Sequence, residues 1–364
     1  MYSETDIAPL RAWVDIDTAA LRRNAFALAN RAGVPLLPVV KADGYGCSAP
    51  HVARSLAALN PWGFAVATAD EGMALRDDGI ENAILVLTPS LPDELAMAWA
   101  DDLRPSLDSR ESIATWIGLG GGPWHLSIDT GINRSGAPWQ SIGALADILA
   151  AHPPEGAYSH FHSAETDPTS VVEQEARFRA AVNAMPARPP VLHTANSAAI
   201  VRQGASPWDL VRPGVFLYGS TTGKGAAIVP EPVVSVRARV VALRTCSDGD
   251  TVSYGATWRA RGERRIATLG IGYADGVHRA LGNRGEALLA GRRVPIVGVV
   301  TMDLCMIDVT DVPCEIGDVA TIVGQDGDDM LGIDEVAERC GTVAYELLVA
   351  FRLRLPRRDL ERSA

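Results

Sequence analysis

The sequence predicts an α/β fold, with an N-terminal (β/α)8 barrel followed by a C-terminal domain made mostly of strands. Three observations support this. The chain has 364 residues, enough for a large barrel and a smaller unit. Over about the first 215 residues, short apolar runs alternate with segments of helical spacing. From residue 228 on, in "IVPEPVVSVRARVVALRT", the chain changes to strand-like runs separated by turn residues.

Eight apolar runs are the candidate barrel strands. Most are near-continuous Val, Ile and Leu, as expected of parallel strands buried on both faces. They lie at 35–42, 63–68, 83–88, 103–107, 124–129, 156–161, 190–195 and 210–214. Segments such as "ADEGMALRDDG" supply the helical crossovers, and eight such units are the count for a TIM-like barrel. The third and fourth runs are weak, so a doubly wound sheet is the alternative.

The second domain begins after two prolines, Pro230 and Pro232, which mark a boundary. We therefore assign 14–232 to the barrel and 233–364 to the β domain, which an N-terminal strand within 1–13 joins. Long strand-like runs such as "ALLAGRRVPIVGVVTMDLCMIDV" fill the second domain. Two short helices, "IDEVAERCG" and "YELLVAF", are expected near the end of the chain.

Composition excludes several classes of function. The net charge is -11, so a general nucleic-acid role is not expected, because phosphate neutralisation needs a basic face. The five cysteines form no CxxC pair, which supports neither a disulfide framework nor a zinc site. The N-terminus lacks the features of a signal peptide, and no apolar run has the length of a membrane span. These features predict a cytoplasmic protein without a metal or membrane partner.

Polar side chains gather where the predicted barrel strands end, which is where such barrels place their active sites. Reading off these ends gives Lys41, Thr68, Asp129, His160, His193 and Arg212. Four of the six can carry positive charge, and an anionic ligand would explain that concentration in an acidic protein. The two histidines would be core residues in the alternative interpretation.

Lys41 stands at the end of an apolar run, in "PLLPVVKADGYG". It is either a lysine whose stem lies along apolar surface or an amine that forms a Schiff base with a carbonyl compound. In "VRPGVFLYG", Arg212 ends the eighth run and Gly214 allows close backbone approach, as in the phosphate sites of these barrels. Pyridoxal phosphate is a carbonyl compound with a phosphate, and it would satisfy both positions.

Two further residues have a structural and a functional interpretation. In "HTANSAAI", Asn196 or Ser197 would cap the next helix or offer a hydroxyl to a phosphate. In "LGIGYADGV", Tyr273 precedes an Ala-Asp-Gly turn, where it would pack beside a hairpin or act in a site.

The motifs together resemble the alanine racemases. "VVKADGYG" is similar to their pyridoxal-phosphate lysine motif, and the similarity extends in order through "DTGINRSG", "HTANSAA", "VRPGVFLYG", "SYGATW", "GYADG" and "VTMD", with "DIDTAALRRN" near the start. Several of these motifs also occur in other fold-type III enzymes. "GYADG" followed by "TMD" in a β domain is more specific to the racemases.

The resemblance implies a homodimer whose active sites lie at the barrel mouths and are completed by the partner's β domain. It makes Lys41 the Schiff-base lysine and one catalytic base, and Tyr273 from the partner subunit the other. The cofactor, pyridoxal 5'-phosphate, would be held by Lys41, Tyr45, His160, Ser197, Arg212, Gly214 and Val215. His160 would lie beside the pyridine ring and support Arg212. Arg134 and the backbone N–H of Met302 would bind the substrate carboxylate.

The sequence departs from the family pattern at several places. Ser127 replaces a lysine that many members modify to a carbamate, so we hypothesise that an anion such as chloride, or a water, accompanies Arg134. Anomalous scattering with neither at Arg134 would contradict this. The usual His-Gly is here Cys47-Ser48, an entrance arginine is replaced by Val299, and Leu353 stands where some members have a tyrosine. These changes concern substrate range rather than reaction type.

We therefore expect a racemase that interconverts L- and D-alanine and supplies D-alanine for cell-wall precursors. The first alternative is a racemase of the same fold with serine or broad specificity. The others are a fold-type III decarboxylase, which would not need Tyr273, and a non-catalytic pyridoxal-phosphate carrier, which would not need the β domain.

Overall fold

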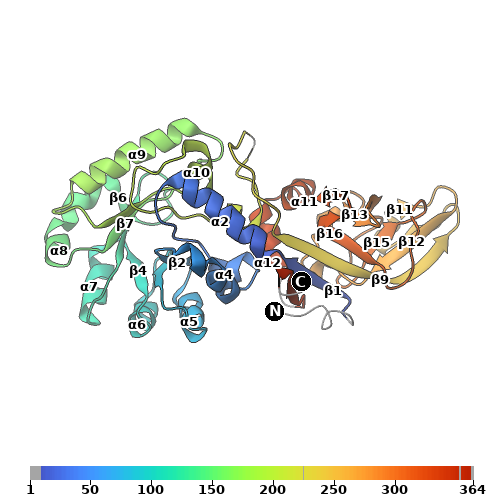
Figure 1. Cartoon of the computed structure of the whole chain (residues 1–364), viewed down its shortest axis with the longest axis horizontal. Coiled ribbons are helices and arrows are strands. Elements are labelled where there is room, and N and C mark those ends of the chain that lie inside the picture. The colour runs from blue at the N-terminus through green and yellow to red at the C-terminus, as the bar shows by residue number, and fades with distance from the viewer. Residues whose placement is uncertain (1–9, 224, 352–353, 362–364) are drawn as a thin grey trace. The chain divides into compact units, whose positions relative to one another are not determined.

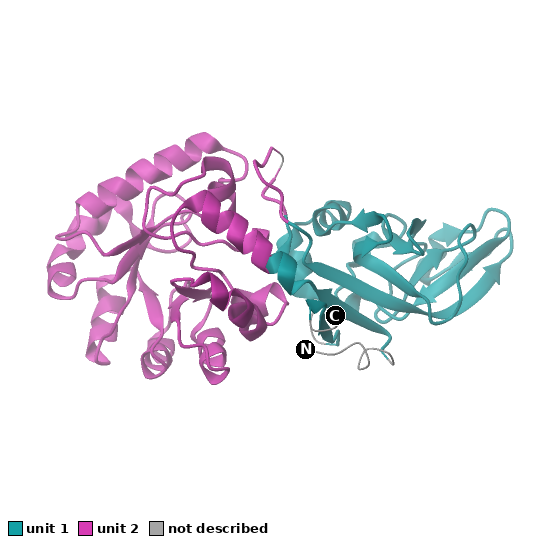
Figure 2. Cartoon of the chain, in the orientation of Figure 1, with its two compact units in different colours: residues 1–21, 218–220, 231–364 teal, residues 22–217, 221–230 magenta. Residues whose placement is uncertain are grey.

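The computed structural model describes residues 10–223, 225–351 and 354–361. These residues form two compact units (Figure 2). The unit we call the barrel unit holds 22–217 and the described residues of 221–230, and the β unit holds the described residues up to 21, 218–220 and from 231 on. The domain limits expected at 14–232 and 233–364 stay a prediction.

The described part of the barrel unit contains a parallel sheet in the order β2-β3-β4-β5-β7-β8. Its strands are β2 (Gly63–Val66), β3 (Ala83–Val86), β4 (Arg104–Leu107), β5 (His125–Asp129), β7 (Gly156–Tyr158) and β8 (Val191–His193), and a two-residue strand, β6 (Ala137–Pro138), also pairs with β5. All six coincide with predicted runs. The parallel pairing places the carboxyl end of each strand at the same rim.

The predicted strands at 35–42 and 210–214 do not form regular strands. They close the barrel through isolated parallel bridges, Leu36 with Val211, Val39 with Ala65 and Asn196 with Arg212. Prolines at 35, 38 and 213 explain this, because proline removes ladder donors and confines pairing to single residues. The bridges keep both segments in the ring, so the predicted barrel is retained.

Helices surround the barrel strands on their outer side (Figure 1). They are α2 (Thr18–Ala32), α4 (Ala49–Leu56), α5 (Ala69–Asp77), α6 (Pro92–Ala100), α7 (Arg110–Gly118), α8 (Ala146–Ala151), α9 (Pro168–Asn183) and α10 (Ser197–Gln203). Side-chain caps fix several starts. Thr68 accepts a hydrogen bond from Glu71 N at the start of α5, and Asn196 does so from Ala199 N at the start of α10.

The described residues of the β unit form a nine-stranded sheet with the path β14-β13-β16-β9-β1-β18, with β12, β15 and β17 attached to it. The strands are β1 (Ala12–Ile16), β9 (Val234–Cys246), β12 (Arg264–Leu269), β13 (Glu286–Leu289), β14 (Arg292–Pro295), β15 (Cys305–Asp308), β16 (Val319–Asp326), β17 (Asp329–Leu331) and β18 (Arg357–Asp359). A hairpin of β10 (Thr251–Val252) and β11 (Trp258–Arg259) stands apart. Strand β9 alternates buried and half-buried residues over its first half, as the two-residue period of a strand requires.

The chain ends of the β unit pair within this sheet. Strand β1 runs antiparallel to β9 and parallel to β18. The expected N-terminal strand is therefore at Ala12–Ile16, while residues 1–9 of the predicted range lie outside the described residues. The two short helices are present as α11 (Ile333–Cys340) and α12 (Ala344–Ala350). Leu353 also lies outside the described residues.

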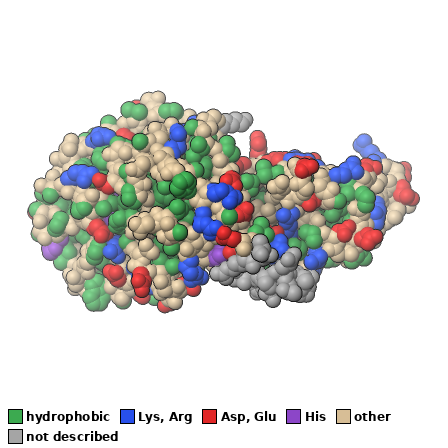
Figure 3. Space-filling model, in the orientation of Figure 1, with side chains coloured by type: hydrophobic (Ala, Val, Ile, Leu, Met, Phe, Trp, Pro, Cys, Tyr) green, Lys and Arg blue, Asp and Glu red, His purple; other side chains and the backbone are tan. Residues whose placement is uncertain are grey.

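The surface carries mixed charge. Basic and acidic side chains are interspersed over the face shown in Figure 3. Ion pairs occur in both units, such as Arg110 with Asp147 in the barrel unit and Arg293 with Glu335 in the β unit. In the described residues, no helix is both long and apolar enough to cross a bilayer.

Candidate active site

Lys41 begins a tight left-handed turn, α3 (Lys41–Tyr45), directly after the first barrel segment. Ala42, Asp43 and Tyr45 have φ values of +54°, +56° and +53°. Each non-glycine residue costs about 1–2 kcal/mol in this conformation, so the surrounding structure must hold it. Ala42 N donates to Glu71 Oε1 at 2.7 Å, which anchors the start of the turn. The turn therefore fixes the backbone that carries Lys41.

The surroundings of Lys41 lower the pKa of its amine. Burial lowers its pKa below the ordinary lysine value, and the charge of Arg134 lowers it further, while Glu71 acts in the opposite direction. A lowered pKa increases the neutral fraction of the amine, which is the form that attacks a carbonyl or accepts a proton.

Three residues build a small cradle beside this turn. Gly214 N donates to Ser197 Oγ at 2.8 Å. A Cβ on Gly214 would lie 2.8 Å from Tyr45 Oη, so any larger residue there would require the Tyr45 hydroxyl to move. Because Asn196 caps α10, the hydroxyl of Ser197 is not needed for the cap. Val215 follows as the buried first residue of a short 3-10 helix, η3 (Val215–Tyr218).

Arg212 is buried at the barrel mouth, and four of its five N–H groups have acceptors. Nη1 donates to His193 Nδ1 at 2.7 Å and to His193 O at 2.9 Å. Nη2 donates to Ser159 O at 2.6 Å and to Thr194 O at 3.1 Å. Among the described residues, none accepts from the Nε–H. Burial lowers the pKa of Arg212 to about 10, so the guanidinium stays charged at neutral pH.

The histidine that contacts Arg212 is His193, not His160 as we inferred from the sequence. His193 ends β8 and pairs with Tyr158, whereas His160 lies two residues beyond the end of β7, so the two histidines are at different levels of the barrel. His160 lies near the cations instead: burial lowers its pKa to about 3, with further contributions from Arg212, Arg134 and Lys41. His160, Lys41, Arg134 and Arg212 are thus electrostatically coupled at one mouth.

Arg134 lies in the loop after β5, and its side chain has no hydrogen bond or ion pair within the described part of the chain. Asp129, which ends β5, shapes this loop by accepting from Gly131 N at 2.8 Å and Asn133 N at 3.2 Å. Asp129 and the helix cap Thr68 therefore have structural roles among the strand-end residues. A charged side chain without a protein partner leaves Arg134 available to an anion.

Tyr273 and Met302 lie together in the β unit. Tyr273 N donates to Thr301 O at 2.9 Å, and Ala274 N donates to Met302 O at 3.0 Å. A Cβ on Gly272 would overlap the carbonyl oxygens of Thr301 and Met302, so these two turns are in close backbone contact. The side chains remain exposed, 43% for Tyr273 and 53% for Met302. None of the described residues accepts a hydrogen bond from Met302 N.

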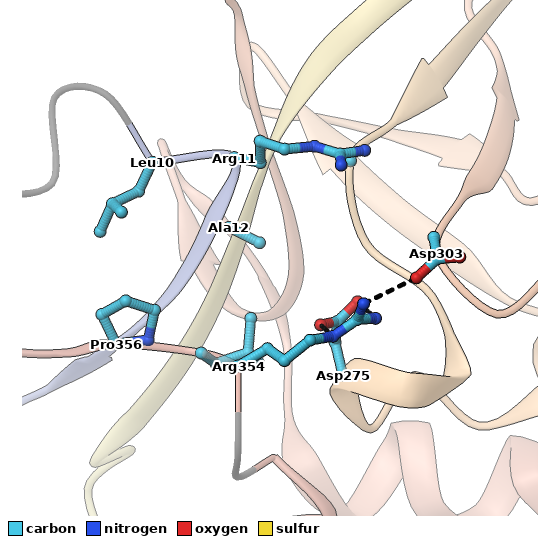
Figure 4. Close-up of a pocket in the computed structure, with 9 residues that line it drawn as sticks. Leu10, Arg11, Ala12, Asp275, Asp303, Arg354 and Pro356 are labelled. Atoms are coloured by element: carbon cyan, nitrogen blue, oxygen red, sulfur yellow. Dashed lines mark hydrogen bonds and ion pairs between the residues drawn. The ribbon is translucent and has the colours of Figure 1, made fainter.

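Arg354 bridges the two turns through Asp275 and Asp303 (Figure 4). Arg354 Nε lies 3.0 Å from Asp275 Oδ1, and its Nη1 lies 2.7 Å from Asp303 Oδ1. Asp275 is buried and also accepts from Gly272 N at 2.9 Å. The positions of Tyr273 and Met302 within the unit are therefore fixed by a charge cluster that the sequence analysis did not identify.

Comparison with known protein families agrees with this arrangement. Residues 16–222 match the family model of the alanine racemase N-terminal domain, and residues 233–359 match that of its C-terminal domain. The chain belongs to the alanine racemase family. The family, the fold class and the class of enzyme inferred from the sequence are confirmed.

Individual relatives cover almost the whole chain. An alanine racemase from Sorangium cellulosum is 40% identical over 340 residues, which are 88% of this chain and 90% of that protein. The crystal structure of the Bacillus anthracis alanine racemase with bound L-Ala-P is 32% identical, with a TM-score of 0.87 over 98% of this chain and 95% of that one. The Bartonella henselae alanine racemase, with covalently bound pyridoxal phosphate, is 28% identical, with a TM-score of 0.89 over 97% and 100%.

The barrel site of this family member fits the cofactor seen in that last relative. Gly214 leaves a cradle that a Cβ would fill, Lys41 offers an amine with a lowered pKa, and Arg212 has one N–H for which the described residues supply no acceptor. A phosphate, a carbonyl carbon and a pyridine nitrogen are the groups that these three features would bind.

Proposed function

We propose that this racemase interconverts L- and D-alanine with pyridoxal 5'-phosphate, as a homodimer, and supplies D-alanine for cell-wall precursors in the cytoplasm. The observation that carries the proposal is the arrangement at the barrel mouth. There, a lysine with a lowered pKa, an arginine with one uncommitted donor and a backbone cradle belong to one site. When bound, the cofactor withdraws electron density from the bond between the substrate's α-carbon and its proton.

The barrel residues would hold and orient the cofactor. Lys41 would carry it covalently, and Tyr45, Ser197, Gly214 and Val215 would surround its phosphate. Arg212 would face the pyridine nitrogen with its Nε–H. Because an arginine cannot readily give up a proton, it would donate a hydrogen bond to this nitrogen without protonating it. Such an arrangement moderates the electron withdrawal and should limit transamination as a side reaction.

Two bases would then exchange the α-proton, one on each face of the substrate, as racemisation requires. We assign Lys41 to the D side and Tyr273 of the partner subunit to the L side. Arg134 and the N–H of Met302 would hold the substrate carboxylate. The exposure of Tyr273 and Met302 in a single chain supports the idea that a second chain covers them.

Proton exchange tests the reaction directly. The holoenzyme is incubated with L-alanine in heavy water, and NMR follows the α-proton while a chiral assay measures D-alanine. We expect Lys41→Ala to lose both activities. Tyr273→Phe should keep the bound cofactor and lose about 10²–10⁴-fold in exchange rate. Lys224→Arg, at the only other lysine in the sequence, and Tyr345→Phe are matched controls.

Failure would redirect the assignment. If the wild type binds the cofactor but leaves the α-proton of alanine in place, alanine is not the substrate. A panel including L-serine then tests the racemase of different specificity, and carbon dioxide release tests a decarboxylase.

Subunit mixing tests the shared site. Lys41→Ala and Tyr273→Phe chains are inactive alone, but a mixed dimer has one site with both catalytic residues intact if Tyr273 acts across the interface. Random mixing should restore about a quarter of wild-type activity, since half of the dimers are mixed and half of their sites are intact. No recovery would show that both residues act within one chain.

A further inference from the structure

A row of four side chains crosses the interior of the barrel from Arg212 to Glu155. Arg212 Nη1 lies 2.7 Å from His193 Nδ1, and His193 Nε2 lies 2.8 Å from His125 Nδ1. His125 Nε2 lies 3.5 Å from Glu155 Oε2. The proposed reaction assigns no role to His125 or Glu155.

The row connects the two ends of the barrel. Glu155 immediately precedes β7, and His125 is the first residue of β5, so both lie at the amino ends of parallel strands. His193 is the last residue of β8, and Arg212 stands at the mouth beside it. The two imidazoles therefore lie between Glu155 and Arg212 at the cofactor side of the barrel.

Arg212 and Glu155, the two ends of the row, together favour one arrangement of protons on the two imidazole rings. Arg212 can only donate, so His193 Nδ1 must accept, and the proton of this ring is then on Nε2. His193 Nε2–H donates to His125 Nδ1, which places the proton of His125 on its own Nε2. This N–H makes no hydrogen bond with the described residues, but it lies 3.5 Å from Glu155 Oε2, and a nearby carboxylate attracts an N–H and repels a nitrogen lone pair. Reversing either ring would set two donors or two acceptors against each other.

The surrounding packing is adapted to both rings. His125 and His193 are fully buried, and burial lowers the pKa of each, so both are neutral at neutral pH. A Cβ on Gly156 would lie 2.5 Å from His125 Cε1, so glycine leaves the space for this ring. The Tyr158 ring stacks on His193 with centroids 5.1 Å apart. Arg104 Nε, 3.3 Å from Glu155 Oε2, holds the carboxylate at the far end.

We propose that Glu155 and His125 are positioning residues that keep His193 Nδ1 unprotonated and thereby hold Arg212 with its Nε–H free for the pyridine nitrogen. This inference rests on the proposed function for the identity of that nitrogen. If His193 carried its proton on Nδ1, it would meet the Arg212 donor with a donor, and the guanidinium would lose one of its four fixed contacts. Glu155, at the amino end of the barrel, thus favours the proton position on His193 that allows its hydrogen bond with Arg212 at the carboxyl end.

The first test uses the apoprotein and needs no cofactor. With seven histidines in the chain, long-range ¹H–¹⁵N NMR resolves the protonated nitrogen of each ring, and His193→Gln and His125→Asn assign the two signals. We expect both rings to carry the proton on Nε2. In Glu155→Leu the carboxylate is absent, and the two ¹⁵N shifts of His125 should move toward each other. Glu155→Gln retains an acceptor oxygen and should keep the wild-type shifts.

The second test measures the bound cofactor. In Glu155→Leu the dissociation constant for pyridoxal phosphate should rise about tenfold, and its absorption maximum should move, with Glu155→Gln restoring both. If Glu155→Leu does not fold, His125→Asn provides the same break, because its amide can accept from His193 but cannot reach Glu155. Glu173→Leu, at an exposed carboxylate on α9, is the control.

The outcomes separate the two claims. A His193 proton on Nδ1, or a Glu155→Leu protein that melts at lower temperature with unchanged histidine shifts and absorption maximum, would overturn this inference alone. A wild-type protein that does not bind pyridoxal phosphate would overturn the proposed function, and the positioning role with it. The wild-type proton arrangement together with a moved absorption maximum in Glu155→Leu supports the inference.

Discussion

The two parts of the proposed site differ in how completely one chain builds them. In the barrel unit, Arg212 is buried and has acceptors for four of its N–H groups, and Gly214 and Ser197 are in direct contact. In the β unit, Tyr273 and Met302 are exposed, and only their backbones are fixed. Under the proposed function, the cofactor would be held by residues packed within one chain, whereas the residues proposed for proton exchange lie on a surface that one chain leaves exposed.

Adding one methyl group to the β unit should have the largest effect. In Gly272→Ala the new Cβ overlaps the carbonyl oxygens of Thr301 and Met302, so the turn that carries Tyr273 must shift. We expect α-proton exchange to fall about 10²-fold or more, since a displaced acid–base group loses its contribution. The absorption spectrum of the bound cofactor should stay as in the wild type. A lost cofactor spectrum would show that the two parts are not separable.

A methyl group added to the barrel unit should instead weaken cofactor binding. In Gly214→Ala the new Cβ lies 2.8 Å from Tyr45 Oη, and the dissociation constant for pyridoxal phosphate should rise about tenfold. Adding Tyr45→Phe removes the oxygen, so thermal stability should recover in the double variant while cofactor affinity does not. Recovery of affinity as well would contradict a role of Tyr45 at the phosphate.

The pH dependence of stability should distinguish the buried barrel site from the exposed turn. Unfolded histidine has a pKa of about 6.5, whereas burial and nearby cations lower that of His160 to about 3. Between these values the unfolded chain binds more protons, so the free energy of unfolding falls as the pH falls. His125 and His193, whose pKa values are also lowered, act in the same direction.

Denaturant unfolding of the apoprotein between pH 7 and pH 5 measures this effect. The decrease of the unfolding free energy with falling pH should weaken by up to the contribution of one bound proton in His160→Asn. A flat profile in the wild type would show that these histidines titrate normally in the folded protein.

The smallest effects, on thermal stability, are expected in the charge cluster of Arg354, Asp275 and Asp303. Asp303 is exposed, so Asp303→Asn should change stability by less than about 1 kcal/mol. Asp275 is buried and accepts from both Arg354 and Gly272 N, so Asp275→Asn should cost more, about 1–3 kcal/mol. Thermal unfolding compares the two, and equal effects would remove Asp275 as the anchor of the turn.

The sequence predicted the six regular barrel strands because they are apolar on both faces and separated by helical crossovers. The first and eighth predicted strands form only isolated bridges. Their apolar composition predicted regular strands, but their prolines remove N–H donors that a continuous ladder needs. Because Lys41, His160 and Arg212 lie at the ends of predicted strands, the sequence also predicted that they share one mouth of the barrel. The contact of Arg212 with His193 depends on the register of β7 and β8, which pairs His193 with Tyr158 and which no spacing in the sequence determines.

The sequence did not predict roles for His125 and Glu155, because His125 opens its strand and Glu155 precedes its strand, whereas the predicted site residues lie at strand ends. A polar residue at the start of a buried parallel strand is a signal that would have found His125. Arg354 was missed for a different reason: its partners, Asp275 and Asp303, are distant in sequence.

The left-handed turn at Lys41 also affects how the protein ages. Asp43 and Gly44 form an aspartyl-glycyl pair, which converts to isoaspartate when the glycine nitrogen attacks the side-chain carboxyl carbon. Here Gly44 N is hydrogen-bonded to Val40 O at 2.7 Å, and Asp43 Oδ1 accepts from Ala49 N at 2.9 Å. Both reacting groups are thereby held in other contacts. The geometry that presents the lysine thus shields its neighbours from covalent damage, and conditions that open this turn expose them to it.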